Sequence, residues 1–252
     1  MKPLFLISND DGVTAKGLNH LIRVLRPIAD LFVMAPDRPR SAVSCSITST
    51  IPIGHKIMHV EEGLTICSCT GTPTDCIKLA LDQLLMKRPD LVIGGINHGD
   101  NSSINTHYSG TMGVAMEGAL QGLPSVAFSL SDHNPDADFS ATDDYIVRIV
   151  QAILDKGIPF YTCLNVNFPL TRELKGIKIC RMAIGRWQDE YAPCEHPLGK
   201  HFYWLAGECV NDEPDEADTD LWALENGYVA ITPTQVDVTS YALLNTLKDW
   251  DL

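Results

Sequence analysis

Apolar positions form two recurring patterns in the first two thirds of the chain. Short continuous apolar runs are typical of buried strands, and they lie at 4–8, 31–35, 89–95 and 124–130. Apolar residues at spacings of three and four predict helices between and after these runs. The two clearest stripes consist of Leu18, Leu21, Ile22 and Leu25, and of Tyr145, Ile146, Ile149, Val150 and Ile153. Strands that alternate with helices predict an α/β fold, a mostly parallel sheet with helices on both faces.

A further helix start is marked by residue chemistry. In TGTPTDCIKLALDQLL, Thr72 suits the N-cap, Pro73 suits the first helical position, and Asp75 follows three residues after the cap. From about residue 170 the pattern changes to strand-like pieces, KGIKICRMAIG, KHFYWLAGE and GYVAITPT, which predict a β-rich appendage. We therefore divide the chain into residues 1–184, a catalytic α/β domain, and 185–252, a β-rich arm with a short closing helix at 239–249.

The net charge of the chain limits the classes of molecule that it is expected to bind. The 252 residues carry a formal net charge of −13 without a basic cluster, which argues against nucleic acid polymers. Six of the acids lie in NDEPDEADTD (211–220), which is typical of a solvated loop; a calcium loop is a weaker alternative, because the EF-hand spacing and glycine are missing. A small phosphorylated substrate fits this charge only if a metal ion supplies positive charge.

Targeting signals are missing from the sequence. No apolar stretch approaches the roughly 20 residues that span a bilayer, and the N-terminus lacks the apolar segment of a signal peptide. Eight scattered cysteines contain no CxxC pair, which makes a zinc tetrad or a thioredoxin-like site improbable. We therefore expect a cytoplasmic protein without membrane contact.

Two adjacent carboxylates, Asp10 and Asp11, follow the first strand in LFLISNDDGVTAKG. Like charges repel at this distance unless a cation holds them, and hard divalent cations prefer oxygen ligands. Gly12 permits the sharp turn that lets both side chains reach one ion. The competing interpretation is that both residues merely cap the helix that begins near Thr14.

Other strand ends bring compatible groups to the same edge of the sheet. Ser41 in APDRPRSAVS offers a hydroxyl, and Asn97 in GGINHGDN offers an amide oxygen. Ser109, Gly110 and Thr111 lie at a helix start, where backbone N–H groups bind anions. Ligands of open α/β sheets bind beyond the carboxyl ends of the strands. This set of groups suits metal-assisted hydrolysis of a phosphate ester.

The chain resembles the SurE family of survival-protein 5′-nucleotidases. The matching segments are ISNDDGVTAKG, APDRPRSAVSCSIT, GTPTDCIKLAL, GGINHGDNSSINTHYSGTMGVAMEGAL and TDLWALENGYVAITP, which span residues 4 to about 240. The resemblance implies a Rossmann-like domain and a β-rich C-terminal part that makes dimer or tetramer contacts. It also implies one divalent cation per subunit, such as Mg²⁺ or Mn²⁺, and hydrolysis of nucleoside 5′-monophosphates.

The resemblance also assigns roles to residues. The family's metal ligands correspond to Asp10, Asp11, Ser41 and Asn97, with Asp10 or Asp11 as the base that accepts a proton from the attacking water. Its phosphate contacts correspond to Asn9 and to the turn of Ser109, Gly110 and Thr111. One departure is visible, because the family often has Gly after the metal-binding Ser and this chain has Ala42.

Several alternatives stay open at this point. A haloacid dehalogenase-type phosphatase needs DxDxT, and Gly12 stands where its second Asp belongs. A non-catalytic nucleotide-binding regulatory module is the alternative from another class, although the first turn lacks GxGxxG. The sequence decides neither the base, nor 5′ against 3′ monophosphates or short polyphosphates, nor the metal, nor dimer against tetramer.

Overall fold

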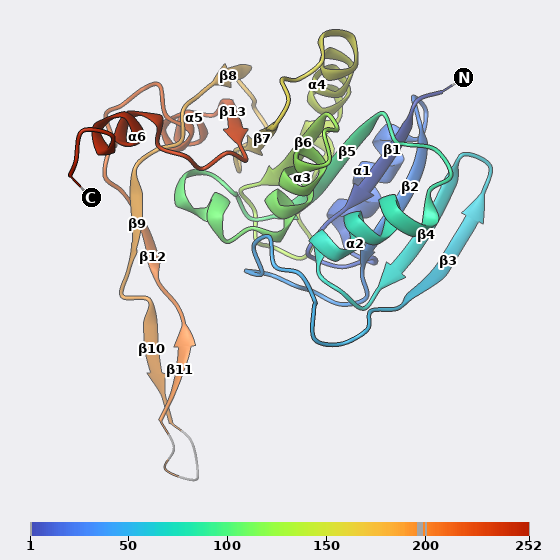
Figure 1. The fold of residues 1–252 in the computed structure, drawn as a ribbon, viewed down its shortest axis with the longest axis horizontal. Helices are drawn as coiled ribbons and strands as arrows, with labels where there is room; N and C mark the ends of the chain where they lie inside the picture. The colour runs from blue at the N-terminus through green and yellow to red at the C-terminus, as the bar shows by residue number, and fades with distance from the viewer. Residues whose placement is uncertain (1, 196–198, 200, 252) are drawn as a thin grey trace.

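A nine-stranded sheet forms the centre of the computed structural model, which describes residues 2–195, 199 and 201–251 (Figure 1). Its strand order is β3-β4-β2-β1-β5-β6-β7-β13-β8. The strands are β1 (Leu4–Ser8), β2 (Asp30–Pro36), β3 (His55–Glu61), β4 (Leu64–Cys69), β5 (Leu91–His98), β6 (Ser125–Leu130), β7 (Thr162–Phe168), β8 (Ile177–Ile179) and β13 (Val229–Gln235). Neighbouring strands are parallel except β3 with β4 and β13 with β7. The predicted α/β fold with a mostly parallel sheet is confirmed.

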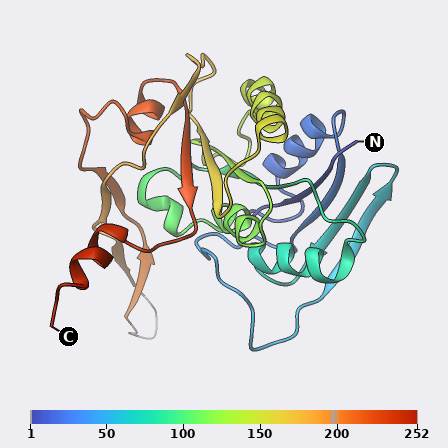
Figure 2. The same ribbon diagram turned by 45° about the horizontal axis from the view of Figure 1, so that its top comes forward.

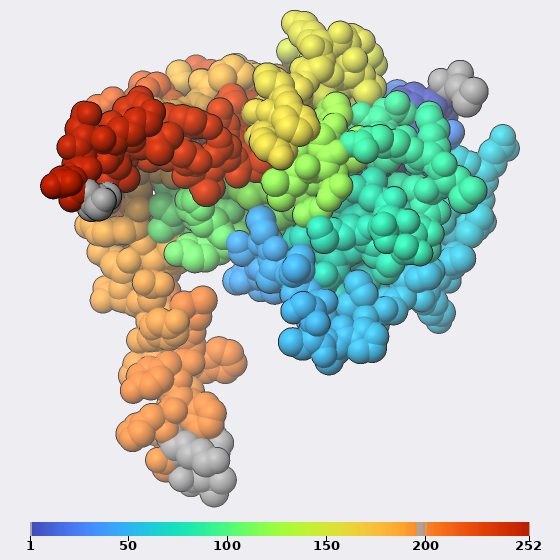
Figure 3. Space-filling model, viewed as in Figure 1, coloured from blue at the N-terminus to red at the C-terminus, as the bar shows by residue number. Residues whose placement is uncertain are grey.

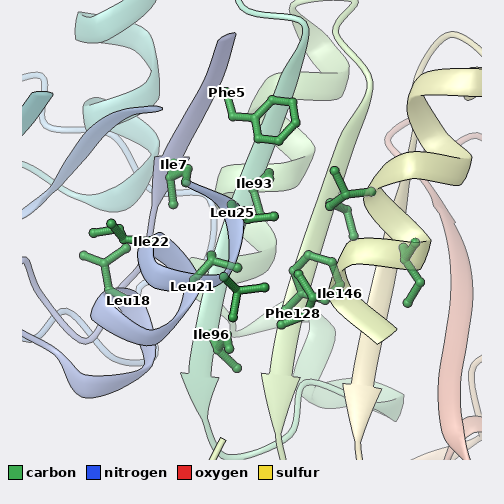
Figure 4. Close-up of a cluster of buried hydrophobic side chains, with 14 of the residues drawn as sticks. Phe5, Ile7, Leu18, Leu21, Ile22, Leu25, Ile93, Ile96, Phe128 and Ile146 are labelled. Atoms are coloured by element: carbon green, nitrogen blue, oxygen red, sulfur yellow. The ribbon is translucent and has the colours of Figure 1, made fainter. Parts of the chain in front are cut away.

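Helices cover both faces of this sheet, as Figure 2 shows. On one face lie α1 (Lys16–Leu25) and α4 (Asp143–Lys156), whose apolar stripes pack on the strands in the main core (Figure 4). On the other face lie α2 (Pro73–Leu79), its one-turn π-helical continuation η1 (Ala80–Leu84), and α3 (Gly110–Leu120). The shorter helices are η2 (Ser103–His107), η3 (Ser140–Thr142), α5 (Asp220–Glu225) and α6 (Tyr241–Leu247). The last of these is the closing helix expected at 239–249.

The helix starts follow the local chemistry of the sequence. Thr72 caps α2 by accepting the Asp75 N–H at 3.1 Å, and the Asp75 carboxylate accepts the Thr72 N–H at 2.8 Å, so the predicted capping box is present. Helix α1 instead begins at Lys16 with Ala15 at the N-cap and no side-chain cap. The interpretation of Asp10 and Asp11 as helix caps is therefore wrong.

The order of the strands creates a switch point at the middle of the sheet. Strand β1 pairs with β2 on one side and with β5 on the other, and all three run parallel. The chain thus leaves β1 in one direction and later returns to build β5, β6 and β7 in the other. Crevices beyond the carboxyl ends of such strands are where open α/β sheets bind ligands. Asp10 and Asp11 follow β1 at this point, and Asn97 lies near the end of β5.

The segment after residue 170 does not form one appendage. The strand in GYVAITPT is β13, which inserts between β7 and β8 in the central sheet, contrary to the expectation that it belongs to the appendage. Its residues Val229, Ala230 and Ile231 are buried. Strand β13 thus belongs to the core of the central sheet, where it is the hydrogen-bonded neighbour of β7. The division at 184/185 into two domains stays a prediction.

A narrow antiparallel arm projects from the body of the molecule (Figure 3). Strand β9 pairs with β12 at the base of the arm, and β10 pairs with β11 farther out. The bounds are β9 (Gly185–Gln188), β10 (Tyr191–Cys194), β11 (Phe202–Leu205) and β12 (Glu208–Asn211). Tyr191, Tyr203 and Trp204 are largely exposed, at 66%, 59% and 72% of their surface.

The acidic segment 211–220 is more ordered than a solvated loop. Arg181 forms ion pairs with Glu213 at 2.8 Å and with Asp218 at 3.0 Å. Asp220 is fully buried, and its carboxylate accepts the N–H groups of Ser103 and Ala183, each at 2.9 Å. The prediction of a solvated loop is therefore wrong for Asp220, which is buried, whereas Asp212, Asp215, Glu216 and Asp218 are exposed as it expects.

Among the described residues, the helices are all too short or too polar to cross a lipid bilayer.

Candidate active site

Asp10 is buried against the N-terminus of α3. Only 4% of its surface is exposed. Its carboxylate accepts the Thr111 hydroxyl at 2.7 Å and the Gly110 N–H at 3.1 Å. Burial nevertheless raises the pKa of Asp10 to about 6, because desolvation outweighs these hydrogen bonds and the neighbouring Asp11 adds repulsion. A buried carboxylate with a pKa near neutrality is suited to hold a cation or to accept a proton.

Asp11 turns toward the end of β5 instead of toward α3. Its carboxylate accepts the backbone N–H of His98 at 3.2 Å. Burial raises the pKa of Asp11 also, although the His98 N–H and the charges of His98 and His133 act in the opposite direction. The adjacent carboxylates thus connect β1 to two different segments, the first turn of α3 and the end of β5.

The turn that follows β1 holds these carboxylates in place. Gly12 has a φ of 101°, which a residue with a Cβ rarely adopts. Both amide atoms of Asn9 bond the backbone of Gly12 at 3.2 Å: its nitrogen donates to the carbonyl and its oxygen accepts the N–H. Asn9 is fully buried, so its visible contribution is to brace this turn.

Ser41 and Asn97 come from the neighbouring strand ends. Ser41 is exposed and directly follows Arg40, whose N–H donates to the Asp10 carbonyl at 2.6 Å. Asn97 is half-buried, and its amide nitrogen donates to the carbonyls of His98 and Gly99, at 3.3 and 2.8 Å. This use of the nitrogen leaves the Asn97 oxygen as the atom suited to a cation. Backbone contacts thus join the segments of all four expected metal ligands.

The departure at Ala42 has a structural counterpart. Ala42 has a φ of 58°, in the left-handed region where glycine is favoured. The family's frequent glycine after the metal-binding serine therefore matches a backbone conformation that is present here. Ala42 adopts it at a steric cost without removing any oxygen from the site.

The turn expected to bind phosphate has a second role in this structure. Ser109 caps α3 by accepting the Met112 N–H at 2.9 Å, while Gly110 and Thr111 donate to Asp10. The anion at the positive end of α3 is thus the Asp10 carboxylate. A Cβ on Gly110 would lie 2.8 Å from the Asp10 Cβ, so glycine is what lets helix and carboxylate approach. A phosphate beside Asp10 would be within reach of the same first turn.

The donor set fits a hard divalent cation. Within the part of the chain that the structure describes, no three His, Cys, Asp or Glu side chains group together as metal ligands. A cation at this site would thus depend on the carboxylates of Asp10 and Asp11 and on the neutral oxygens of Ser41 and Asn97. All four are oxygen donors, which Mg²⁺ and Mn²⁺ prefer. The repulsion and desolvation that raise the pKa of Asp10 are also what a bound cation would relieve.

A buried polar cluster that was not predicted from the sequence lies behind the site. Asn165 and Asn167 of β7 bond the backbone of Asn101, in the loop that leads from β5 to α3. Each asparagine is at most 1% exposed. The available signal was the pattern LNVNFP, in which polar residues alternate within a strand that is otherwise apolar.

Comparisons with known proteins identify the family of the chain. The family model described as Survival protein SurE matches residues 5–189. A 5′-nucleotidase SurE from Bacteroides fragilis is 54% identical over 251 residues, which cover 100% of this chain and 98% of the relative. One from Phocaeicola vulgatus is 56% identical with the same coverage. The crystal structure of the SurE protein from Aquifex aeolicus has a TM-score of 0.84 and 39% identity, with 98% of each chain covered.

Proposed function

The chain belongs to the SurE family, and from this premise we propose that it is a 5′-nucleotidase whose hydrolysis of nucleoside 5′-monophosphates depends on a divalent cation held by Asp10, Asp11, Ser41 and Asn97. The expected enzyme class agrees with its relatives in Bacteroides fragilis and Phocaeicola vulgatus, which are named 5′-nucleotidases and align over the whole chain. The observation that best supports the metal is the Asp10–Asp11 pair, two adjacent and largely buried carboxylates that follow β1, with no cationic side chain of the described residues bonded to either one.

A bound cation would supply positive charge against the phosphate and lower the pKa of a water molecule. The other tasks fall to residues of the chain. Asp10 or Asp11 accepts the proton of the attacking water, a role that a carboxylate with a raised pKa performs well near neutral pH. Asn9 and the turn Ser109–Gly110–Thr111 hold the phosphate oxygens. The support for this turn is that its donors already bind a carboxylate oxygen at 2.7 and 3.1 Å.

The same proposal includes self-association through the arm. A narrow two-stranded arm buries little of its own apolar surface, and Tyr191, Tyr203 and Trp204 remain largely exposed on it. Exposed aromatic residues in such numbers are typical of protein interfaces. We propose a homodimer or homotetramer whose contacts use residues 185–252. Deletion of 186–206, a range that includes residues outside the described part, should give a smaller species by light scattering, and an unchanged mass would contradict this role.

Release of inorganic phosphate from a nucleoside 5′-monophosphate tests the activity. We expect turnover with Mg²⁺ or Mn²⁺ and none after EDTA treatment. Asp11→Asn should abolish turnover while the circular dichroism spectrum stays unchanged, because the amide has the same shape but no charge for the cation. Asp155→Asn, an exposed carboxylate in the last turn of α4, is the matched control and should retain activity. A non-catalytic binding module would release no phosphate under any of these conditions, and full activity of Asp11→Asn would remove Asp11 from the site.

The nucleophile separates this proposal from an aspartyl-phosphate mechanism. Direct attack by water forms the new P–O bond while the bond to the nucleoside oxygen breaks and that oxygen takes a proton. Single turnover in ¹⁸O-labelled water then labels only the released phosphate. An attacking carboxylate of Asp10 or Asp11 would instead carry the phosphoryl group until water displaces it, and mass spectrometry of the acid-quenched protein would show that added phosphoryl mass.

A further inference from the structure

The loop between β5 and α3, residues 99–109, ends at the turn Ser109–Gly110–Thr111. It contains only one short helix, η2, so its own backbone hydrogen bonds fix it weakly. Any movement of this loop would shift the first turn of α3 relative to Asp10. Errors of about 1 Å at a reacting centre cost large factors in rate. The groups that fasten this loop are therefore candidates for an effect on catalysis.

Two strands provide these groups from the sheet face beneath α3. Ala127 and Cys163 pack against α3, and side chains two residues apart share a face of a strand. The same face continues beyond the start of α3 with Ser129 on β6 and with Asn165 and Asn167 on β7. These three polar side chains are at most 1% exposed.

The two asparagines satisfy both backbone polar groups of Asn101. The Asn167 side-chain oxygen accepts the Asn101 N–H at 2.7 Å. The Asn165 side-chain nitrogen donates to the Asn101 carbonyl at 2.8 Å and to the Thr106 hydroxyl at 3.1 Å. The Asn101 side chain in turn donates to Ser129 at 2.7 Å. The loop is thus held both at the backbone of Asn101 and through the side chains of Asn101 and Thr106.

A hydrogen bond between the two asparagines orients the side-chain amide of Asn165. The Asn167 nitrogen donates to the Asn165 oxygen at 2.8 Å. This contact turns the Asn165 nitrogen toward the loop, where Thr106 also donates to the Asn101 carbonyl at 2.7 Å. Because every member is buried and partnered, a change at Asn165 leaves several groups unsatisfied together.

We propose that Asn165 and Asn167 are positioning residues for the reaction: they fasten the loop 99–109 from the sheet and thereby hold the Ser109–Gly110–Thr111 turn at the distance from Asp10 that phosphate binding requires. This inference rests on the proposed function of that turn. The two asparagines touch neither substrate nor metal ligand, and they act through the backbone of Asn101.

The test combines kinetics with hydrogen exchange on the full-length protein. Asn165→Leu keeps a similar volume and removes both polar atoms. We expect kcat/KM for a nucleoside 5′-monophosphate to fall about tenfold or more, and the inhibition constant for inorganic phosphate to rise by a similar factor. Amide exchange should accelerate in residues 99–111 and stay unchanged in β1 and β5.

A matched control separates positioning from loss of stability. Ser125→Ala removes a buried hydrogen bond of 2.9 Å on the same sheet face, beneath the other end of α3. It should lower the melting temperature without changing either constant. Thr106→Val removes the hydroxyl at the edge of the cluster without changing its shape, and it should produce a smaller change in the same direction as Asn165→Leu. If Asn165→Leu does not fold, Thr106→Val tests the positioning role in its place.

The outcomes distinguish the positioning role of the asparagines from the proposed function. Folded Asn165→Leu or Thr106→Val with unchanged phosphate inhibition and unchanged exchange would overturn the positioning role. If the unaltered protein releases no phosphate with any divalent cation, the proposed function fails. In that case exchange alone decides whether the asparagines hold the loop: faster exchange confined to 99–111 supports it, and unchanged exchange refutes it.

Discussion

The charge of Asp10 should destabilise the metal-free protein, so that Asp10→Asn raises stability while it abolishes activity. The side chain is 4% exposed, and burial raises its pKa to about 6. The folded protein therefore holds this proton more tightly than the unfolded chain, whose pKa at this position has the ordinary value of 3.8. With the folded pKa above the unfolded one, the contribution of Asp10 to stability is fully present below pH 3.8 and is lost as the pH rises through about 6.

The magnitude follows from these two values. A tenfold change in proton affinity corresponds to about 1.4 kcal/mol, so the difference between 3.8 and about 6 corresponds to roughly 3 kcal/mol. Asparagine keeps the shape but accepts fewer hydrogen bonds from Gly110 and Thr111, which costs about 1 kcal/mol. A net gain of about 2 kcal/mol remains above pH 7, equivalent to a melting temperature roughly 4–8 °C higher for a domain of this size.

Thermal melting in EDTA between about pH 5 and pH 8 tests this reasoning. The difference between Asp10→Asn and the unaltered protein should grow with pH and level off above about pH 7. Excess Mg²⁺ should shrink the difference, because the cation stabilises only the protein that binds it. Asp155→Asn should show no such trend. An Asp10→Asn variant that melts below the unaltered protein at pH 8 in EDTA would refute the argument, as would a difference independent of pH.

Three further substitutions probe the surroundings of Asp10 and the framework of the sheet. Gly110→Ala should reduce both phosphatase activity and stability, the latter by about 1–3 kcal/mol, because its Cβ would lie 2.8 Å from the Asp10 Cβ; full activity would show that α3 can move aside. Ala42→Gly should raise stability by about 0.5–1 kcal/mol in urea unfolding, because it relieves a φ of 58°; lower stability would mean that glycine flexibility outweighs the strain. Asp75→Ala should cost about 1–2 kcal/mol or more through loss of the capping box with Thr72 and of the hydrogen bonds from Thr48; an unchanged midpoint would contradict both contributions.

Local patterns in the sequence predicted the framework well. The apolar runs became β1, β2, β5 and β6, and the capping residues of α2 behave as their spacing predicted, because strand burial and capping depend on near neighbours. The choice of partner strand is different. The short apolar run of β13 indicates a strand but carries no information about whether this strand joins the arm or the central sheet.

Prediction of the site from the sequence has the same limit, because local patterns do not reveal distant contacts. The segments that contain Asp10, Asp11, Ser41 and Asn97 could be brought to one edge of the sheet by topology alone. The contact of Asp10 with α3 could not, because it depends on how closely a glycine lets the helix approach. The acidic segment shows the limit at Asp220: a run of charge reveals neither that this acid is buried nor that Arg181 pairs with Glu213 and Asp218.

The contacts that hold the loop 99–109 also determine when the site can form during synthesis. The hydrogen bond from the Ser103 N–H cannot form until Asp220 is synthesised, 117 residues later in the chain. The hydrogen bond from Asn101 likewise requires Asn167, which is 66 residues later. At about 5–20 residues per second, the first of these delays lasts roughly 6–23 s during synthesis. The carboxylates of Asp10 and Asp11 thus leave the ribosome long before the turn that faces them is secured. Nascent or prematurely ended chains would carry the acidic pair before the turn Ser109–Gly110–Thr111 is fixed, so under the proposed function hydrolysis would begin only when synthesis is nearly complete.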